Sequence, residues 1–102
     1  MTPLETTFTF RNMDSTEALK EHTLKKLKKI GKYLVNQNAI AHMVFKVEGP
    51  RHLAEVTLNV KGKRYFGTET SSDMYASVEG AIHRLESQLS KDKERVTRRK
   101  GK

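Results

Sequence analysis

The sequence predicts an α+β domain of order β-α-β-β-β-α, with a four-stranded sheet and two helices packed on one face of it. Two long stretches repeat apolar residues at steps of three and four, which is typical of amphipathic helices. Four shorter stretches carry β-forming residues and are bounded by turn residues. The chain has 102 residues, which is enough for one modest core and too few for two.

The first two elements are a strand and a helix. Residues 4–10 alternate Leu4, Phe8 and Phe10 with polar side chains, which predicts a half-buried strand. Thr16 then begins a helical pattern that extends to about Leu34. The inner side of this helix is predicted to consist of Leu19, Thr23, Leu27, Ile30 and Leu34, helped by Ala18.

Three strands follow in antiparallel succession. The inner face of the strand at 39–48 consists of Ala41, Met43, Phe45 and Val47. A turn at Gly49, Pro50 and Arg51 leads to a strand whose inner face is Ala54, Val56, Leu58 and Val60. Lys61, Gly62 and Lys63 close a tight hairpin. The register of the fourth strand, residues 64–70, stays open because Tyr65 and Phe66 are adjacent aromatic residues.

The stretch at residues 71–100 predicts a capped amphipathic helix that starts at Asp73, its N-cap. Its apolar face consists of Met74, Tyr75, Val78, Ala81, Ile82, Leu85 and Leu89. Tyr75 is therefore expected to be buried rather than to serve as a platform for stacking bases. The domain is predicted to span residues 1–95, followed by a basic, disordered tail at 96–102.

Charge is concentrated on the two helices. The chain carries 20 Lys and Arg against 12 Asp and Glu, a net charge of +8. Residues 15–34 hold six lysines and two glutamates, and residues 71–102 hold eight basic and five acidic side chains. If both helices share one face, the lysines of the first meet the basic residues of the second in a cationic groove. Such a groove favours a polyanionic partner, with nucleic acid as the first candidate.

Other classes of function find little support. The chain has no cysteine, which excludes disulfides, thiolate catalysis and Cys-based zinc sites. Its histidines fall on different elements without ligand-like spacing: His22, His42, His52 and His83. No phosphate loop, nucleophile elbow or carboxylate pair is found, so we expect no enzyme, metal, cofactor or small-molecule substrate. The absence of a secretory signal and of a membrane-length apolar run predicts a cytoplasmic protein.

Several segments then point to a known family. They are Thr16-Glu17-Ala18-Leu19, Phe45-Lys46-Val47-Glu48, Asp73-Met74-Tyr75-Ala76, Leu85, Gln88-Leu89, Lys91 and Lys93. With these segments the chain resembles the ribosome hibernation promoting factors from about residue 4 to residue 95. This family includes the ribosome-associated translation inhibitors and carries the older name sigma-54 modulation proteins.

The resemblance implies a domain that binds the small ribosomal subunit in stationary or stressed bacterial cells. There it would occupy the channel of mRNA and of the A- and P-site tRNAs, block translation and protect idle ribosomes. The implied rRNA contacts are Lys25, Lys26, Lys28, Lys29, Lys32, Arg84, Lys91, Lys93 and Arg95. Lys26, Lys29, Lys91 and Lys93 match family lysines most directly, so joint reversal of their charges is expected to abolish binding.

Long members of the family append a domain that pairs two ribosomes, whereas this chain resembles a short member. Its short basic end favours the branch that promotes ribosome dimerisation, in which a dimerising partner protein could take part. Two alternatives stay open. The first is a protein-binding regulator of sigma-54 transcription, and the second is a generic double-stranded RNA-binding domain, which also packs two helices on one face of a sheet.

Overall fold

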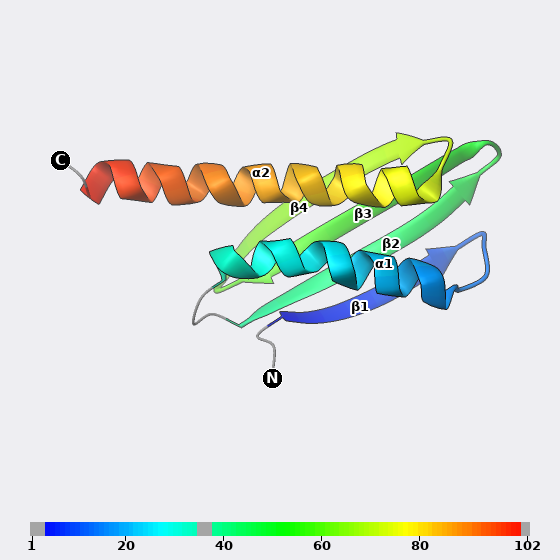
Figure 1. Ribbon diagram of the computed structural model, residues 1–102, viewed down its shortest axis with the longest axis horizontal. Coiled ribbons are helices and arrows are strands. Elements are labelled where there is room, and N and C mark those ends of the chain that lie inside the picture. Colours follow the sequence, from blue (N-terminus) through cyan, green and yellow to red (C-terminus); the bar gives the residue numbers. More distant parts are fainter. Residues whose placement is uncertain (1–3, 35–37, 101–102) are drawn as a thin grey trace.

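The structure, a computed structural model, describes residues 4–34 and 38–100, and of residues 93–100 only the backbone. The predicted order of elements is confirmed (Figure 1). In chain order they are β1 (Leu4–Arg11), α1 (Glu17–Leu27), the 3₁₀ helix η1 (Lys28–Tyr33), β2 (Ala39–Glu48), β3 (Arg51–Val60), β4 (Lys63–Ser71) and α2 (Met74–Lys100).

The four strands form one mixed sheet in the order β1-β2-β3-β4. β1 lies parallel to β2, with Phe8 opposite Met43, because the chain crosses over through α1 and η1 before it re-enters the sheet. β2, β3 and β4 are antiparallel neighbours, as predicted. Both helices lie on the same face of the sheet (Figure 1), and the core fills the space between the two layers.

The helix after Thr16 begins where it was predicted, since the Thr16 hydroxyl accepts a hydrogen bond from the Leu19 amide at 3.0 Å. Its predicted inner residues are all buried, but Ala18 is exposed and takes no part in the core. The α-helix ends at Leu27 and continues as η1. Leu27, Ile30 and Tyr33 follow one another at steps of three, which suits a 3₁₀ helix of three residues per turn.

In α2, Asp73 is the N-cap, because its Oδ1 accepts from the Tyr75 amide at 3.1 Å. The predicted apolar face is buried, with the exception of Tyr75, which is 40% exposed. The expectation of a buried Tyr75 is therefore wrong. Met74 occupies the core position at the start of the helix, and the next residue is turned about 100° away from it.

The hairpin between β3 and β4 fixes the register that the sequence left open. Lys61 and Gly62 both have positive φ, 48° and 78°, as expected for a two-residue type I′ turn. Tyr65 therefore faces the helices and packs against the core. Phe66 points to the uncovered face of the sheet and is 44% exposed.

α2 is longer than the sheet beneath it, and its last turns extend beyond the strands (Figure 1). Its helical backbone continues to Lys100, and the division into a domain at 1–95 and a tail at 96–102 stays a prediction. None of the helices in the described ranges is long and apolar enough to cross a membrane.

Candidate nucleic-acid interface

Most of the basic residues singled out from the sequence lie on the outward side of the two helices. Lys25, Lys28, Lys29 and Lys32 are exposed on α1 and η1, and Arg84 and Lys91 are exposed on α2. Lys26 is only half-buried, with 29% of its side chain exposed. Lys93 and Arg95 lie in α2, but their side chains are outside the described residues.

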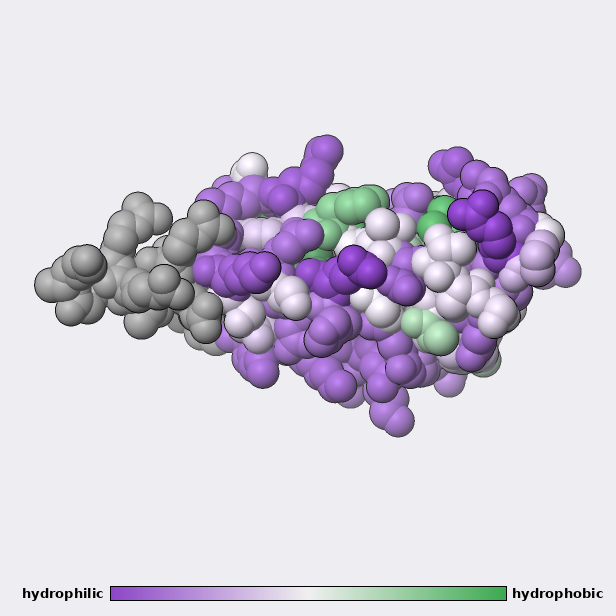
Figure 2. Space-filling view, turned by 90° about the horizontal axis from the view of Figure 1, so that it is seen from above, coloured by the Kyte–Doolittle hydropathy of each residue, from purple (hydrophilic) through white to green (hydrophobic). Residues whose placement is uncertain are grey.

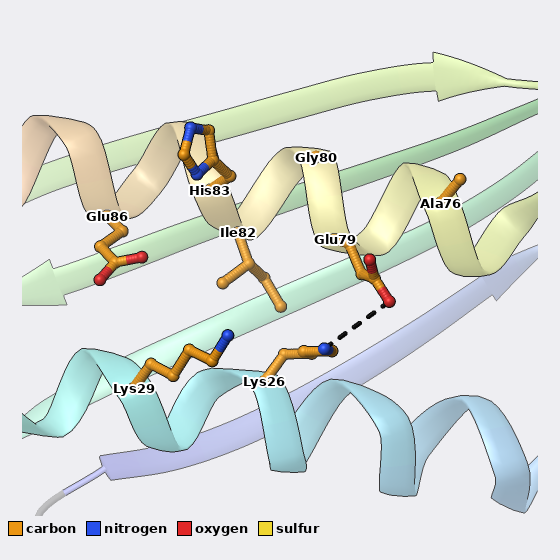
Figure 3. A pocket seen from close by; sticks show the side chains of 8 residues that line it. All are labelled: Lys26, Lys29, Ala76, Glu79, Gly80, Ile82, His83 and Glu86. Carbon is orange, nitrogen blue, oxygen red and sulfur yellow. Dashed lines mark ion pairs between the residues drawn. The ribbon is translucent and has the colours of Figure 1, made fainter.

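A groove of about 440 Å³ lies between α1–η1 and α2 (Figure 3). It is lined by Lys26, Lys29, Ala76, Glu79, Gly80, Ile82, His83 and Glu86. Figure 3 shows the two lysines rising from the first helical segment, with Ile82 and the two glutamates on the α2 side. The two lysines, one from α1 and one from η1, thus face an apolar strip that is flanked by carboxylates.

The expectation that the lysines of the first helix meet basic residues of the second in a cationic groove is wrong, because they meet carboxylates. Lys26 Nζ lies 3.7 Å from Glu79 Oε2, and Lys32 Nζ lies 3.9 Å from Glu86 Oε2. Glu79 and Glu86 are seven residues apart, so both fall on the side of α2 that faces α1. Arg84 lies on the side of α2 that faces β4, where its Nε donates to Glu69 Oε1 at 2.9 Å.

The ion pairs divide the predicted contact residues into two groups. Lys26, Lys32 and Arg84 each pair with a carboxylate from another element, and so link parts of the fold. Lys25, Lys28, Lys29 and Lys91 form no ion pair with any other residue in the described ranges. The second group is therefore available to an external anion without loss of an internal contact.

Three residues that sequence reasoning did not assign to the site meet at the start of the groove. Tyr75 and His22 form an edge-to-face pair with ring centroids 4.9 Å apart. Nε2 of His22 lies 3.3 Å from Glu79 Oε2, although the two atoms are not aligned for a hydrogen bond. The signal in the sequence was the spacing of four that joins His22 to Lys26 and Tyr75 to Glu79.

Gln88, which belongs to the recognised motif, and two other polar residues of α2 hold the fold together. The Gln88 side chain donates to the Phe66 carbonyl at 2.6 Å and accepts from the Phe66 amide at 3.1 Å. Ser77 is buried and donates to the His52 carbonyl at 2.6 Å. The ends of α2 and β4 are joined through Asp92, which accepts from the Tyr65 hydroxyl at 2.6 Å. These groups are already engaged within the domain.

The surface over α2 and the β4 edge is predominantly hydrophilic, with small apolar patches (Figure 2).

Within the described ranges, no cluster of three or more His, Asp or Glu side chains could hold a metal ion. His42, for example, lies on the uncovered sheet face, where its Nδ1 is 2.6 Å from Thr7 Oγ1.

The fold and its outward lysines define the class of protein: it is a small basic α+β domain whose helical layer is exposed. The family described as Sigma 54 modulation protein / S30EA ribosomal protein matches residues 6–97, and the chain belongs to this family. The resemblance noted in the sequence is confirmed.

Relatives named ribosome hibernation promoting factor are similar over 93 residues, which cover 91% of this chain and 97% of theirs. Those of Escherichia coli K12 and Salmonella typhimurium are 33% and 32% identical. The N-terminal domain of Thermus thermophilus Protein Y matches with a TM-score of 0.78 and 25% identity, over 85% of this chain and 97% of that one. A ribosomal subunit interface protein from Coxiella burnetii matches with a TM-score of 0.77 and 27% identity, over 88% and 98%.

Proposed function

We propose that this protein is a ribosome hibernation factor that binds the small ribosomal subunit through its helical layer. It occupies the channel of mRNA and of the A- and P-site tRNAs, and so keeps idle ribosomes from translating and stabilises them under stress. The names of its relatives, ribosome hibernation promoting factor and ribosomal subunit interface protein, support this role. A ribosomal partner also favours a cytoplasmic location.

The proposal is supported by one observation about individual residues, the exposed lysines of the helical layer. Lys25, Lys28, Lys29 and Lys91 are exposed on the helical layer and pair with no carboxylate of the described residues. Lysines that contact phosphates displace condensed counterions, which gives strong and salt-sensitive binding. The shape of folded RNA then provides selectivity. Blocking the channel is steric and requires no chemical step.

The test is a triple charge reversal of Lys28, Lys29 and Lys91 to Glu. We expect the variant to lose co-sedimentation with purified small subunits at physiological salt, because three phosphate contacts become repulsive. Lys26, which the sequence placed in this set, is left unchanged since its reversal would also disrupt the pair with Glu79.

The matched control reverses Arg51, Lys61 and Arg64, which are exposed at the hairpin ends of the sheet. This control has the same net charge as the test variant and should still co-sediment. Equal binding of the test variant and the wild type would show that the helical layer is not the contact surface. Equal loss in both variants would mean that net charge alone determines binding.

We further propose that the protein promotes ribosome dimerisation together with a partner protein. Adding the protein to idle ribosomes should then raise the fraction that sediments as pairs. A fall in that fraction would place it in the branch that blocks dimerisation.

A second candidate is the regulation of sigma-54 transcription, which the family description itself suggests. A sucrose gradient of a stationary-phase lysate separates the candidates. Migration with small subunits or ribosomes supports hibernation, and migration with free polymerase supports the regulator. Equally tight binding to naked RNA duplexes would instead indicate a generic duplex binder.

A further inference from the structure

Two pairs of side chains from α1 and α2 contact each other beside the groove, which Lys26 and Glu79 help to line. His22 and Lys26 lie four residues apart on α1, and Tyr75 and Glu79 lie four residues apart on α2. We call these four residues the quartet. Within it, Glu79 Oε2 is 3.3 Å from His22 Nε2 and 3.7 Å from Lys26 Nζ. The Tyr75 ring meets the His22 ring at an angle of 80°.

The quartet is accessible from outside. Tyr75 is 40% exposed, and the Glu79 side chain is 51% exposed. Both close contacts of Glu79 involve Oε2, which leaves Oε1 without a partner among the described residues. Next to the quartet, the groove continues over Gly80 and Ile82 to Lys29, which forms no ion pair there (Figure 3).

Charge decides what the groove can accept. A phosphate group would be repelled by Glu79 and Glu86, which line the groove from the α2 side. A neutral group with N–H donors would instead be attracted to these carboxylates. The ring of Tyr75, a residue that is 40% exposed, lies beside them and favours a flat group that stacks.

We propose that the quartet is a subsite for one unpaired guanine of a bound RNA. The base stacks on Tyr75 and donates to the Glu79 carboxylate, while its phosphate stays outside the groove, toward the exposed lysines of α1 and η1. His22 holds the Tyr75 ring and Glu79 in place as a positioning residue. This inference rests on the proposed function, because it specifies part of an RNA contact made by the helical layer.

Guanine is the base that fits a carboxylate. Its Watson–Crick edge presents two neighbouring donors, N1–H and the 2-amino group, which match the two oxygens of a carboxylate. Adenine and cytosine place a ring acceptor beside their amino group, and uracil flanks its single N–H with two carbonyls. In each of these bases an acceptor would face the carboxylate and be repelled.

The test uses the full chain and three six-nucleotide RNAs, AAAGAA, AAAIAA and AAAAAA, where I is inosine, which lacks the 2-amino group. Fluorescence anisotropy at low salt should rank their affinities as guanine, then inosine, then adenine. We expect about tenfold between the first and the last, the discrimination typical of a bidentate base contact. Equal affinities would overturn the subsite.

The variant Glu79→Gln distinguishes the subsite from a purely electrostatic effect, because the two predict opposite changes in affinity for AAAGAA. Removal of a negative charge beside a polyanion should strengthen binding if only electrostatics acts. The subsite instead predicts that E79Q weakens AAAGAA binding about tenfold and leaves AAAAAA binding unchanged or tighter. Glu55→Gln, on the uncovered sheet face, is the control for charge. A variant Glu79→Asp, which keeps the charge but shortens the side chain, should also lose the preference for guanine.

The ring is tested with Tyr75→Phe and Tyr75→Leu. Phe keeps the stacking surface and should bind as the wild type does, whereas Leu should lose about tenfold for AAAGAA. Phe66→Leu, at an exposed aromatic residue on the far face of the sheet, should have no effect. Circular dichroism of each variant confirms that the fold is retained.

Co-sedimentation with small subunits separates this inference from the function on which it rests. If the wild type binds the subunit but none of the oligonucleotide differences is found, the subsite is wrong and the function stands. If E79Q weakens subunit binding without a change in base preference, a basic group of a ribosomal protein contacts Glu79 and the subsite is again wrong. Failure of the wild type to bind subunits overturns the proposed function itself.

Discussion

At Gly67, β4 and α2 approach each other so closely that no side chain fits between them. A Cβ atom at this position would collide with the backbone carbonyl of Ala81. The same contact region includes Gly80, where an added Cβ would lie 2.7 Å from Glu69 Cγ. These small residues allow α2 to lie low on the sheet, which fixes its height and rotation relative to α1.

The variant Gly67→Ala should therefore destabilise the domain by about 1–3 kcal/mol or more, because the helix must shift away from the strand. Gly31→Ala is the matched control, since nothing lies within 4 Å of its added Cβ. We expect it to be neutral or slightly stabilising. Thermal and urea unfolding of both variants measure the difference. Equal stability would show that α2 does not depend on this contact for its position.

At the scale of elements, β4 is the strand whose outer edge α2 covers. Gln88 forms two hydrogen bonds with the Phe66 backbone, as donor at 2.6 Å and as acceptor at 3.1 Å. An amide side chain thereby takes the place of a neighbouring strand. This protects an edge that could otherwise pair with another chain.

Substitution of Gln88 by Ala should remove both hydrogen bonds and expose this part of the edge. The expected loss is about 1 kcal/mol, since each exposed hydrogen bond contributes little net free energy. The amide of Phe66 should exchange with solvent faster, and the variant should self-associate more readily on heating. Hydrogen exchange and light scattering measure these effects, with the exposed neighbour Ser87→Ala as control. Unchanged exchange at Phe66 would contradict the role given to Gln88.

At the scale of the whole molecule, the net charge of +8 and the exposed lysines of the helical layer set the dependence of binding on salt. Each phosphate contact contributes a slope of about −0.7 to −0.9 to the logarithm of affinity against the logarithm of salt concentration. Stacking on Tyr75 would contribute affinity but no slope, because it releases no counterion.

The variant Lys29→Gln should thus reduce the magnitude of the salt slope of small-subunit binding by about one unit. The variant Tyr75→Leu should lower the affinity at all salt concentrations and leave this slope unchanged. Arg51→Gln, away from the helical layer, serves as the control. Titrations at four or more salt concentrations measure the slopes. A slope that Lys29→Gln leaves unchanged would mean that this lysine makes no phosphate contact.

The order of elements, their caps and, apart from Ala18 and Tyr75, their buried faces were determined by the sequence itself. Thr16 and Asp73 act as caps through hydrogen bonds to amides two or three residues further along the chain. The inner residues of β2 and β3 follow a period of two that the strand geometry imposes. Such features depend on near neighbours in the chain, so the residues alone were sufficient to predict them.

Only the tertiary structure decided what faces the groove. Periodicity tells which side of a helix is buried, but the rotation of α2 relative to α1 depends on its packing against β4, at Gly67 and Ala81. That rotation turns Glu79 toward Lys26 and Arg84 toward Glu69. It also leaves the Tyr75 ring exposed beside His22. These contacts join residues far apart in the sequence, so the spacing within each helix shows which residues share a side but not which residues of the other helix they meet.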